Sequence, residues 1–102
     1  MVINNIDWLI MFVQPGSPFL TRSDGSVTLG MTDGRTKTIY LDDNLRGLML
    51  DRVLAHELVH AFMFSYDIHI DIEFEEYIAD WISLFGRDLV YLLDNLMQKL
   101  RY

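Results

Sequence analysis

Cysteine is absent from this chain of 102 residues. Its absence excludes disulfides, thiol nucleophiles and Cys-ligated zinc, so any bound metal must be held by histidines and carboxylates. Basic residues are also few: eight Lys and Arg face fifteen Asp and Glu, which gives a net charge of −7, and they form no run. Because phosphate binding needs a basic surface, we expect no nucleic-acid partner.

Long apolar runs are missing as well. The apolar run Trp8–Val13 is far too short to cross a bilayer. The N-terminal segment contains Asp7 and has neither a basic region nor a small-residue cleavage site, which is not typical of a signal peptide. We therefore expect a soluble, cytoplasmic protein without a membrane partner. About half of the residues are apolar, which favours one globular domain over residues 1–102.

The N-terminal half of the chain has the patterns of β-strands. Residues 7–14 are apolar and rich in strand-forming side chains, and the loop sequence "PGSP" follows them. Residues 26–32 and 35–41 flank an Asp-Gly pair, which favours a two-residue hairpin turn. Residues 7–41 therefore predict a small, mainly antiparallel sheet of about three strands.

The pattern becomes helical over residues 42–101. Asp42, Asp43 and Asn44 are N-cap candidates for a helix that continues to about Phe64, where "SYDIH" is expected to break it. Because apolar residues lie nearly all round this helix, we expect it to be buried at the centre of the domain.

Two further helices are expected, over about residues 71–85, ending near Gly86, and over about residues 87–101. The last one carries a leucine stripe with polar residues opposite, which indicates either a partner-binding face or core packing; core packing is the commoner use and we favour it. The stripe consists of Leu89, Leu92, Leu93, Leu96 and Leu100. The predicted fold class is α+β: a small sheet, a central helix and two further helices.

The central helix contains the sequence "HELVH". His56 and His60 are four residues apart, so both imidazoles leave one helix face and can bind one ion. Glu57 lies about 100° around the helix, too far for a third ligand but able to reach a water in an open coordination position. The alternative is two buried core histidines beside a solvated Glu. Without an ion, that cluster would be costly in an apolar helix, and so we favour a metal site.

The third ligand is expected on the next helix. Glu76 and Asp80 are four residues apart, on one face, and Ala79 between them is small enough for close approach to the "HELVH" helix. Glu76 can complete a His2Glu site, and Asp80 can accept the free ring N–H of a histidine ligand. His69 and Glu75 are the alternative third ligands, and otherwise we expect Glu75 to be solvated.

The pair of motifs "HELVH" and "EEYIAD" resembles the gluzincin metallopeptidases. More narrowly, it is similar to the short ImmA/IrrE-like proteins of phages and mobile elements, whose signature is HExxH followed by a Glu-x-x-Ala-Asn/Asp helix. The strand sequence "TKTIYLDD" before the helix also fits that family's order of sheet, then helix. The resemblance covers roughly residues 26–86.

The resemblance implies a minimal zincin-like fold and a zinc-dependent peptidase. One zinc ion would be held by His56, His60 and Glu76, with Glu57 as the general base that activates a metal-bound water. Asp80 would be the second acid, beside a histidine ligand. The partner would be a peptide or protein substrate.

The resemblance also implies an edge strand that binds extended peptide, for which residues 26–32 and 35–41 are the candidates. Tyr66, His69 and Tyr77 are the candidates for contacts with substrate or transition state. The alternative function is a catalytically silent, zincin-like protein that binds a partner such as a regulator. The sequence leaves the oligomeric state open.

Overall fold

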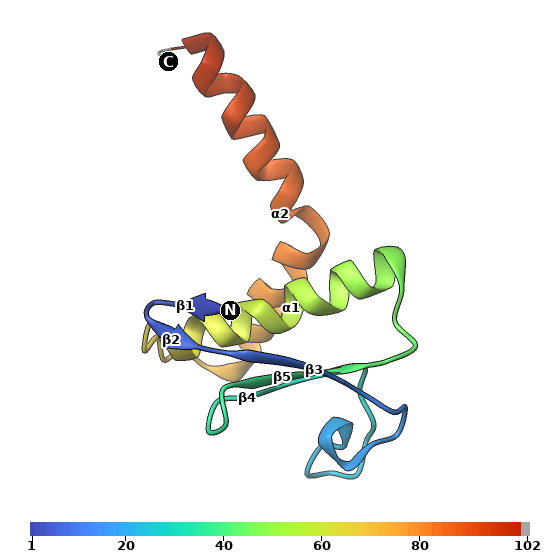
Figure 1. Cartoon of the computed structure of the whole chain (residues 1–102). Coiled ribbons are helices and arrows are strands. Elements are labelled where there is room, and N and C mark those ends of the chain that lie inside the picture. Colours follow the sequence, from blue (N-terminus) through green and yellow to red (C-terminus); the bar gives the residue numbers. More distant parts are fainter. Residues whose placement is uncertain (101–102) are drawn as a thin grey trace.

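A computed structural model describes residues 1–100 of the chain and has α+β architecture (Figure 1). Its elements are, in order, β1 (Val2–Ile3), β2 (Ile6–Asp7), β3 (Leu9–Val13), the 3-10 helix η1 (Pro18–Leu20), β4 (Gly30–Asp33), β5 (Thr38–Asp42), α1 (Gly47–Ser65) and α2 (Ile72–Leu100). Strands β1 and β2 form a separate two-stranded antiparallel hairpin. Within residues 1–100, no helix combines the length and the apolar character needed to cross a membrane.

The main sheet has the strand order β3-β5-β4, with β5 at its centre. Strand β5 is antiparallel to β4 but parallel to β3. The prediction of three strands is confirmed, whereas the predicted mainly antiparallel pairing holds for only one of the two pairs. A hairpin forces its two strands to be antiparallel, but the long connection after β3 is sufficient for a parallel crossover. The direction of β3 was therefore not fixed by local sequence.

The turn between β4 and β5 has four residues, 34–37, rather than the predicted two. Asp33 organises it: its carboxylate accepts a hydrogen bond from the backbone N–H of Arg35 at 2.9 Å, which holds the pKa of Asp33 below its ordinary value. Gly34 allows the half-exposed Phe64 ring to lie close to the turn, because a Cβ at this position would be 2.0 Å from the ring unless the ring moved. The Asp-Gly pair thus marks the turn correctly but not its length.

Strand β5 is buried along its whole length because both faces of the sheet are covered there. On one face, Ile39 and Leu41 are fully buried in the main apolar cluster. On the other face, Tyr40 stacks on Phe19 of η1 with ring centroids 4.6 Å apart. The cluster draws on the N-terminal hairpin, the sheet and α1, and consists of Ile3, Trp8, Ile39, Leu41, Leu45 and Ala61.

Helix α1 ends at Ser65, one residue beyond the predicted end at about Phe64, but begins differently from the prediction. Its N-cap residue is Arg46, whose side chain makes no capping bond. The predicted caps lie before the helix instead: Asp42 ends β5, and Asp43 and Asn44 form the turn after it. The Asp42 carboxylate accepts a hydrogen bond from the Asn44 backbone N–H at 2.8 Å.

The prediction that α1 is buried all round is wrong. Only its residues Glu57, His60, Ala61 and Ser65 are buried, whereas apolar side chains such as Leu48 are exposed. The sheet covers one side of α1, and its first buried residue, Glu57, is a charged one.

The predicted second and third helices are one continuous helix, α2, which passes through Gly86 without a break. A single glycine inside a helix costs only about 1 kcal/mol relative to alanine, which is too little to end a helix that no proline interrupts. The second half of α2 runs away from the sheet and α1 (Figure 1). Its leucine stripe is exposed, from 43% at Leu96 to 69% at Leu100, so the prediction that it packs on the core is wrong.

Candidate metal centre

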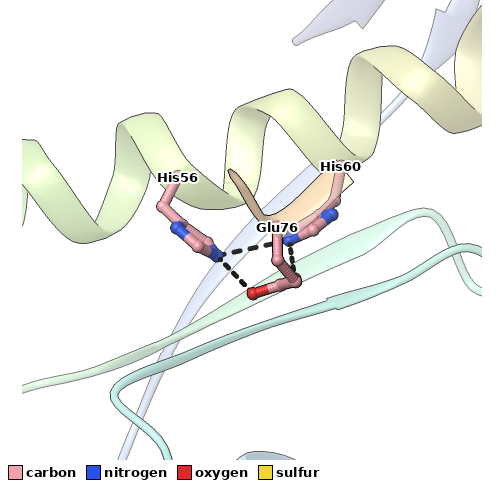
Figure 2. Close-up of side chains that lie close together, drawn as sticks. All are labelled: His56, His60 and Glu76. Atoms are coloured by element: carbon pink, nitrogen blue, oxygen red, sulfur yellow. Dashed lines mark hydrogen bonds and ion pairs between the residues drawn. The ribbon is translucent and has the colours of Figure 1, made fainter. Parts of the chain in front are cut away.

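Three side chains from two helices meet between α1 and α2 (Figure 2). The Nε2 atoms of His56 and His60 lie 3.3 Å apart. One carboxylate oxygen of Glu76 lies 3.3 Å from His56 Nε2, and the other lies 2.7 Å from His60 Nε2. Zinc bonds of about 2.0–2.1 Å in a tetrahedron separate neighbouring ligand atoms by about 3.3 Å. Two of the three distances equal this value, and the 2.7 Å between His60 and Glu76 is a hydrogen-bond distance. The three residues could therefore hold one metal ion.

The outer nitrogens of both histidines are paired with separate carboxylates. His56 Nδ1 lies 2.9 Å from an Asp80 oxygen, and His60 Nδ1 lies 2.5 Å from a Glu75 oxygen. A carboxylate at Nδ1 holds the proton there, so that Nε2 keeps its lone pair for a ligand. Both histidines therefore can offer Nε2, the nitrogen that faces Glu76, as the ligand atom for a metal ion.

Glu75 was expected to be solvated or to serve as an alternative third ligand. Its side chain is instead only 14% exposed and contacts the outer nitrogen of His60. The sequence contained one signal for this: Glu75 is rotated by about 100° from Glu76 on the same helix, so it can approach a histidine from another side. Asp80, in contrast, has the position towards His56 that its spacing from Glu76 predicted.

Two small residues allow the surrounding elements to come close to the candidate metal centre. Ala79 on α2 is fully buried, in agreement with the close approach of α2 to α1 that its size predicted. On the other side, a Cβ at Gly30 of β4 would lie 2.8 Å from Val53 and 3.0 Å from Glu57, both on α1. Strand β4 therefore packs directly against the turn of α1 that carries the motif.

Glu57 is buried, with 8% of the residue exposed. Its carboxylate accepts a hydrogen bond from the Thr32 hydroxyl of β4, at 2.8 Å. Thr32 was not recognised from the sequence, because its contact with Glu57 depends on how β4 packs on α1. The bond fixes the direction of the carboxylate beside the histidines.

The candidate metal centre lies in a cleft with two adjoining halves, of about 480 Å³ and 570 Å³. The walls are β4 with the residues before it, α1 and the first half of α2. Both halves are lined by Arg22, Gly30, His56, Glu57 and Glu76. A separate hollow of about 720 Å³ lies between α1 and the second half of α2, but neither histidine of the motif lines it. The residues that could hold a metal ion therefore line the cleft and not this hollow.

The candidates for contacts with a substrate lie elsewhere on the surface. His69 is 84% exposed and pairs with Asp67, Tyr66 stacks on Phe62, and Tyr77 is 71% exposed. None of Tyr66, His69 and Tyr77 lines the cleft. His69 also lies outside the cluster that could hold a metal ion.

A cation that sequence reasoning missed lines the cleft instead. Arg22 belongs to the loop before β4, and this loop is closed by a pairing between Thr21 and Val27. Within it, Ser26 donates hydrogen bonds from its hydroxyl and backbone N–H to Asp24, which hold the pKa of Asp24 below its ordinary value. Nothing in the local pattern marks Arg22, because the tertiary path of the loop brings it to the cleft.

Comparisons of the chain with protein-family models, with curated proteins and with solved structures find no match. Membership of the ImmA/IrrE-like family therefore stays a prediction from the motifs. What the site can do follows from its own residues.

Proposed function

We propose that this protein is a minimal zinc-dependent metallopeptidase of the gluzincin type, similar to the short ImmA/IrrE-like proteins. The observation that supports this most strongly is the convergence of His56, His60 and Glu76 while separate carboxylates hold both outer ring nitrogens. A set of two histidines and one carboxylate suits zinc, and three protein ligands are typical of catalytic zinc sites.

Peptide hydrolysis at this site needs a base and a means to stabilise charge. Zinc held here would lower the pKa of a water and polarise the scissile carbonyl. Glu57, beside the ligands, takes the proton of the attacking water and passes it to the leaving amine, with Thr32 orienting its carboxylate. We assign to Arg22 the stabilisation of negative charge on the carbonyl oxygen, since its side chain lines the same cleft.

The substrate is proposed to bind in extended form along β4. Of the two candidate segments, residues 35–41 contribute the central strand β5, whose edges are both paired and so cannot accept a peptide. Strand β4 is an edge strand, and it lines the cleft together with the residues before it. An added strand would gain main-chain hydrogen bonds there, while the cleft supplies side-chain specificity.

The proposed activity is tested with the zinc-loaded protein and a mixture of unstructured peptides, whose fragments are identified by mass spectrometry. We expect cleavage that a chelator abolishes and that added zinc restores, because the reaction needs the metal for both charge stabilisation and the nucleophile. Cleavage that continues in the chelator, or a fully zinc-loaded protein that cleaves no peptide, would contradict the proposal.

The second candidate is a catalytically silent protein of the same fold that binds a partner. It is favoured by the positions of Tyr66, His69 and Tyr77, since none of these side chains reaches the cleft. Against it, the cluster within residues 1–100 has three ligand residues, whereas a structural zinc site is closed by a fourth protein ligand. The peptidase is therefore the better supported function.

A further inference from the structure

We propose that the second half of α2 is a self-association surface, against which the same helix of a second copy of this chain packs. The surface is the apolar face of α2 over residues 82–100, on which every member is between 38% and 69% exposed. Its members are Ile82, Phe85, Leu89, Leu92, Leu93, Leu96 and Leu100. Contiguous apolar faces of this kind mark interaction sites rather than ordinary surface.

The spacing on this face is that of helices that pack on one another. From Ile82 to Leu96 the apolar positions follow alternating steps of three and four residues, which is the heptad seam of a coiled coil. The opposite face of the helix carries the polar residues Arg87, Asp94 and Gln98, together with Leu84 and Tyr91. A seam of this period fits the seam of an identical helix, so that each copy supplies the surface that the other needs.

The second half of α2 also needs a partner for its own stability. The first half is held against α1 at the metal centre, and an ion pair between Arg87 and Asp51 is a further link to α1. Beyond this pair the helix runs clear of the domain to Leu100 (Figure 1). An isolated helix shorter than about 12–15 residues is marginal in water, so packing against another element is expected.

The exposed area is close to what a stable dimer uses. A side chain between Leu and Phe in size has about 150–200 Å² of surface. About half of this surface is exposed on each of the seven residues, so the exposed apolar area of the face is on the order of 600 Å². A standard protein–protein interface buries about 800 Å² on each partner. The apolar face supplies most of this area before any flanking polar residue is counted.

The local charge favours a second copy over a partner of opposite charge. The chain as a whole carries −7, but residues 82–100 contain two basic and two acidic side chains and are neutral. These are Arg87, Asp88, Asp94 and Lys99. Two copies that meet at this neutral segment therefore bring little like charge together at the interface. A basic partner would instead be attracted to the acidic rest of the chain.

The test is sedimentation equilibrium of the full chain, as wild type and as the double variant Leu89→Gln/Leu96→Gln. Glutamine has nearly the helix propensity of leucine, so the change removes the apolar seam without disfavouring the helix. We expect a wild-type dimer at tens of micromolar, and a rise of at least about thirtyfold in its dissociation constant in the double variant.

The matched control is Tyr91→Gln, which removes another exposed apolar ring from the opposite face of the same helix and should leave the dissociation constant unchanged. Near-UV circular dichroism, to which the buried Trp8 contributes, checks that each variant keeps its fold. A wild type that is monomeric up to about 100 µM would overturn the proposal, as would equal association of the double variant. If Phe12→Gln dissociated the dimer instead, the interface would be the exposed edge strand β3.

Discussion

Replacing Glu57 with glutamine is expected to abolish peptide hydrolysis and to leave the bound metal in place. General acid–base catalysis typically contributes 10²–10⁴-fold, so we expect turnover to fall by about 10³-fold or more. The amide has nearly the shape of the carboxylate and can still accept the hydrogen bond from Thr32, but it cannot take a proton from water. Binding of metal should be unaffected, because Glu57 is not in the cluster of possible ligands.

The measurement compares cleavage rates and metal content of the wild type, Glu57→Gln and the control Glu73→Gln. Glu73 is an exposed residue in the first turn of α2, so its replacement should change neither quantity. Wild-type cleavage by Glu57→Gln would contradict the proposed mechanism. Loss of metal from that variant would mean instead that Glu57 is a ligand.

Replacing Glu76 with alanine is expected to weaken metal binding more than replacing its neighbour Glu75. In the structure, Glu76 faces both Nε2 atoms, whereas Glu75 contacts only the outer nitrogen of His60. Loss of a carboxylate that contacts the outer nitrogen of a histidine ligand typically lowers metal affinity 10–100-fold. We therefore expect a loss within that range for Glu75→Ala and a larger loss for Glu76→Ala.

Competition with a chromophoric zinc chelator gives the dissociation constants of both variants. His69→Ala is the matched control, because this exposed histidine lies outside the cluster and should not affect affinity. If Glu75→Ala lost more affinity than Glu76→Ala, the roles of the two carboxylates would be reversed. A loss in His69→Ala would restore His69 as the third ligand.

The sequence predicted those parts of the site that depend on helical spacing alone. His56 and His60 on one helix, and Glu76 and Asp80 on the next, follow from positions four residues apart, and the structure brings all four together. Helical geometry is local, so such positions can be read without knowing the fold. Only the presence of both motifs, "HELVH" and "EEYIAD", indicated that these two helices lie against each other.

The contacts that the sequence did not predict come from residues on other elements. Thr32 contacts Glu57 from a strand that lies 25 residues earlier in the chain. Arg22 lines the cleft from a loop, 34 residues before His56. No periodic pattern encodes such meetings, because they depend on the register of β4 and on the path of its preceding loop. The same reason explains the parallel pairing of β3, which only the tertiary path determines.

Two predictions for the helical half of the chain are wrong because local sequence signals do not determine how α2 packs. Gly86 was interpreted as a helix end, but the cost of one glycine is small beside the continuity of a helix of 29 residues. The leucine stripe was expected to cover the core because such stripes usually do. Because α2 continues as one helix that leads away from α1, the leucine stripe in its second half stays exposed.

Metal content per chain, measured by native mass spectrometry after zinc is supplied, tests the proposed site most directly. We expect one zinc ion on the wild-type chain and none on His60→Ala, because that change removes one of three converging ligand atoms. His69→Ala, which changes a histidine outside the cluster, should keep the ion. A wild-type chain that takes up no zinc, or a His60→Ala chain that retains it, would contradict a metal centre at His56, His60 and Glu76.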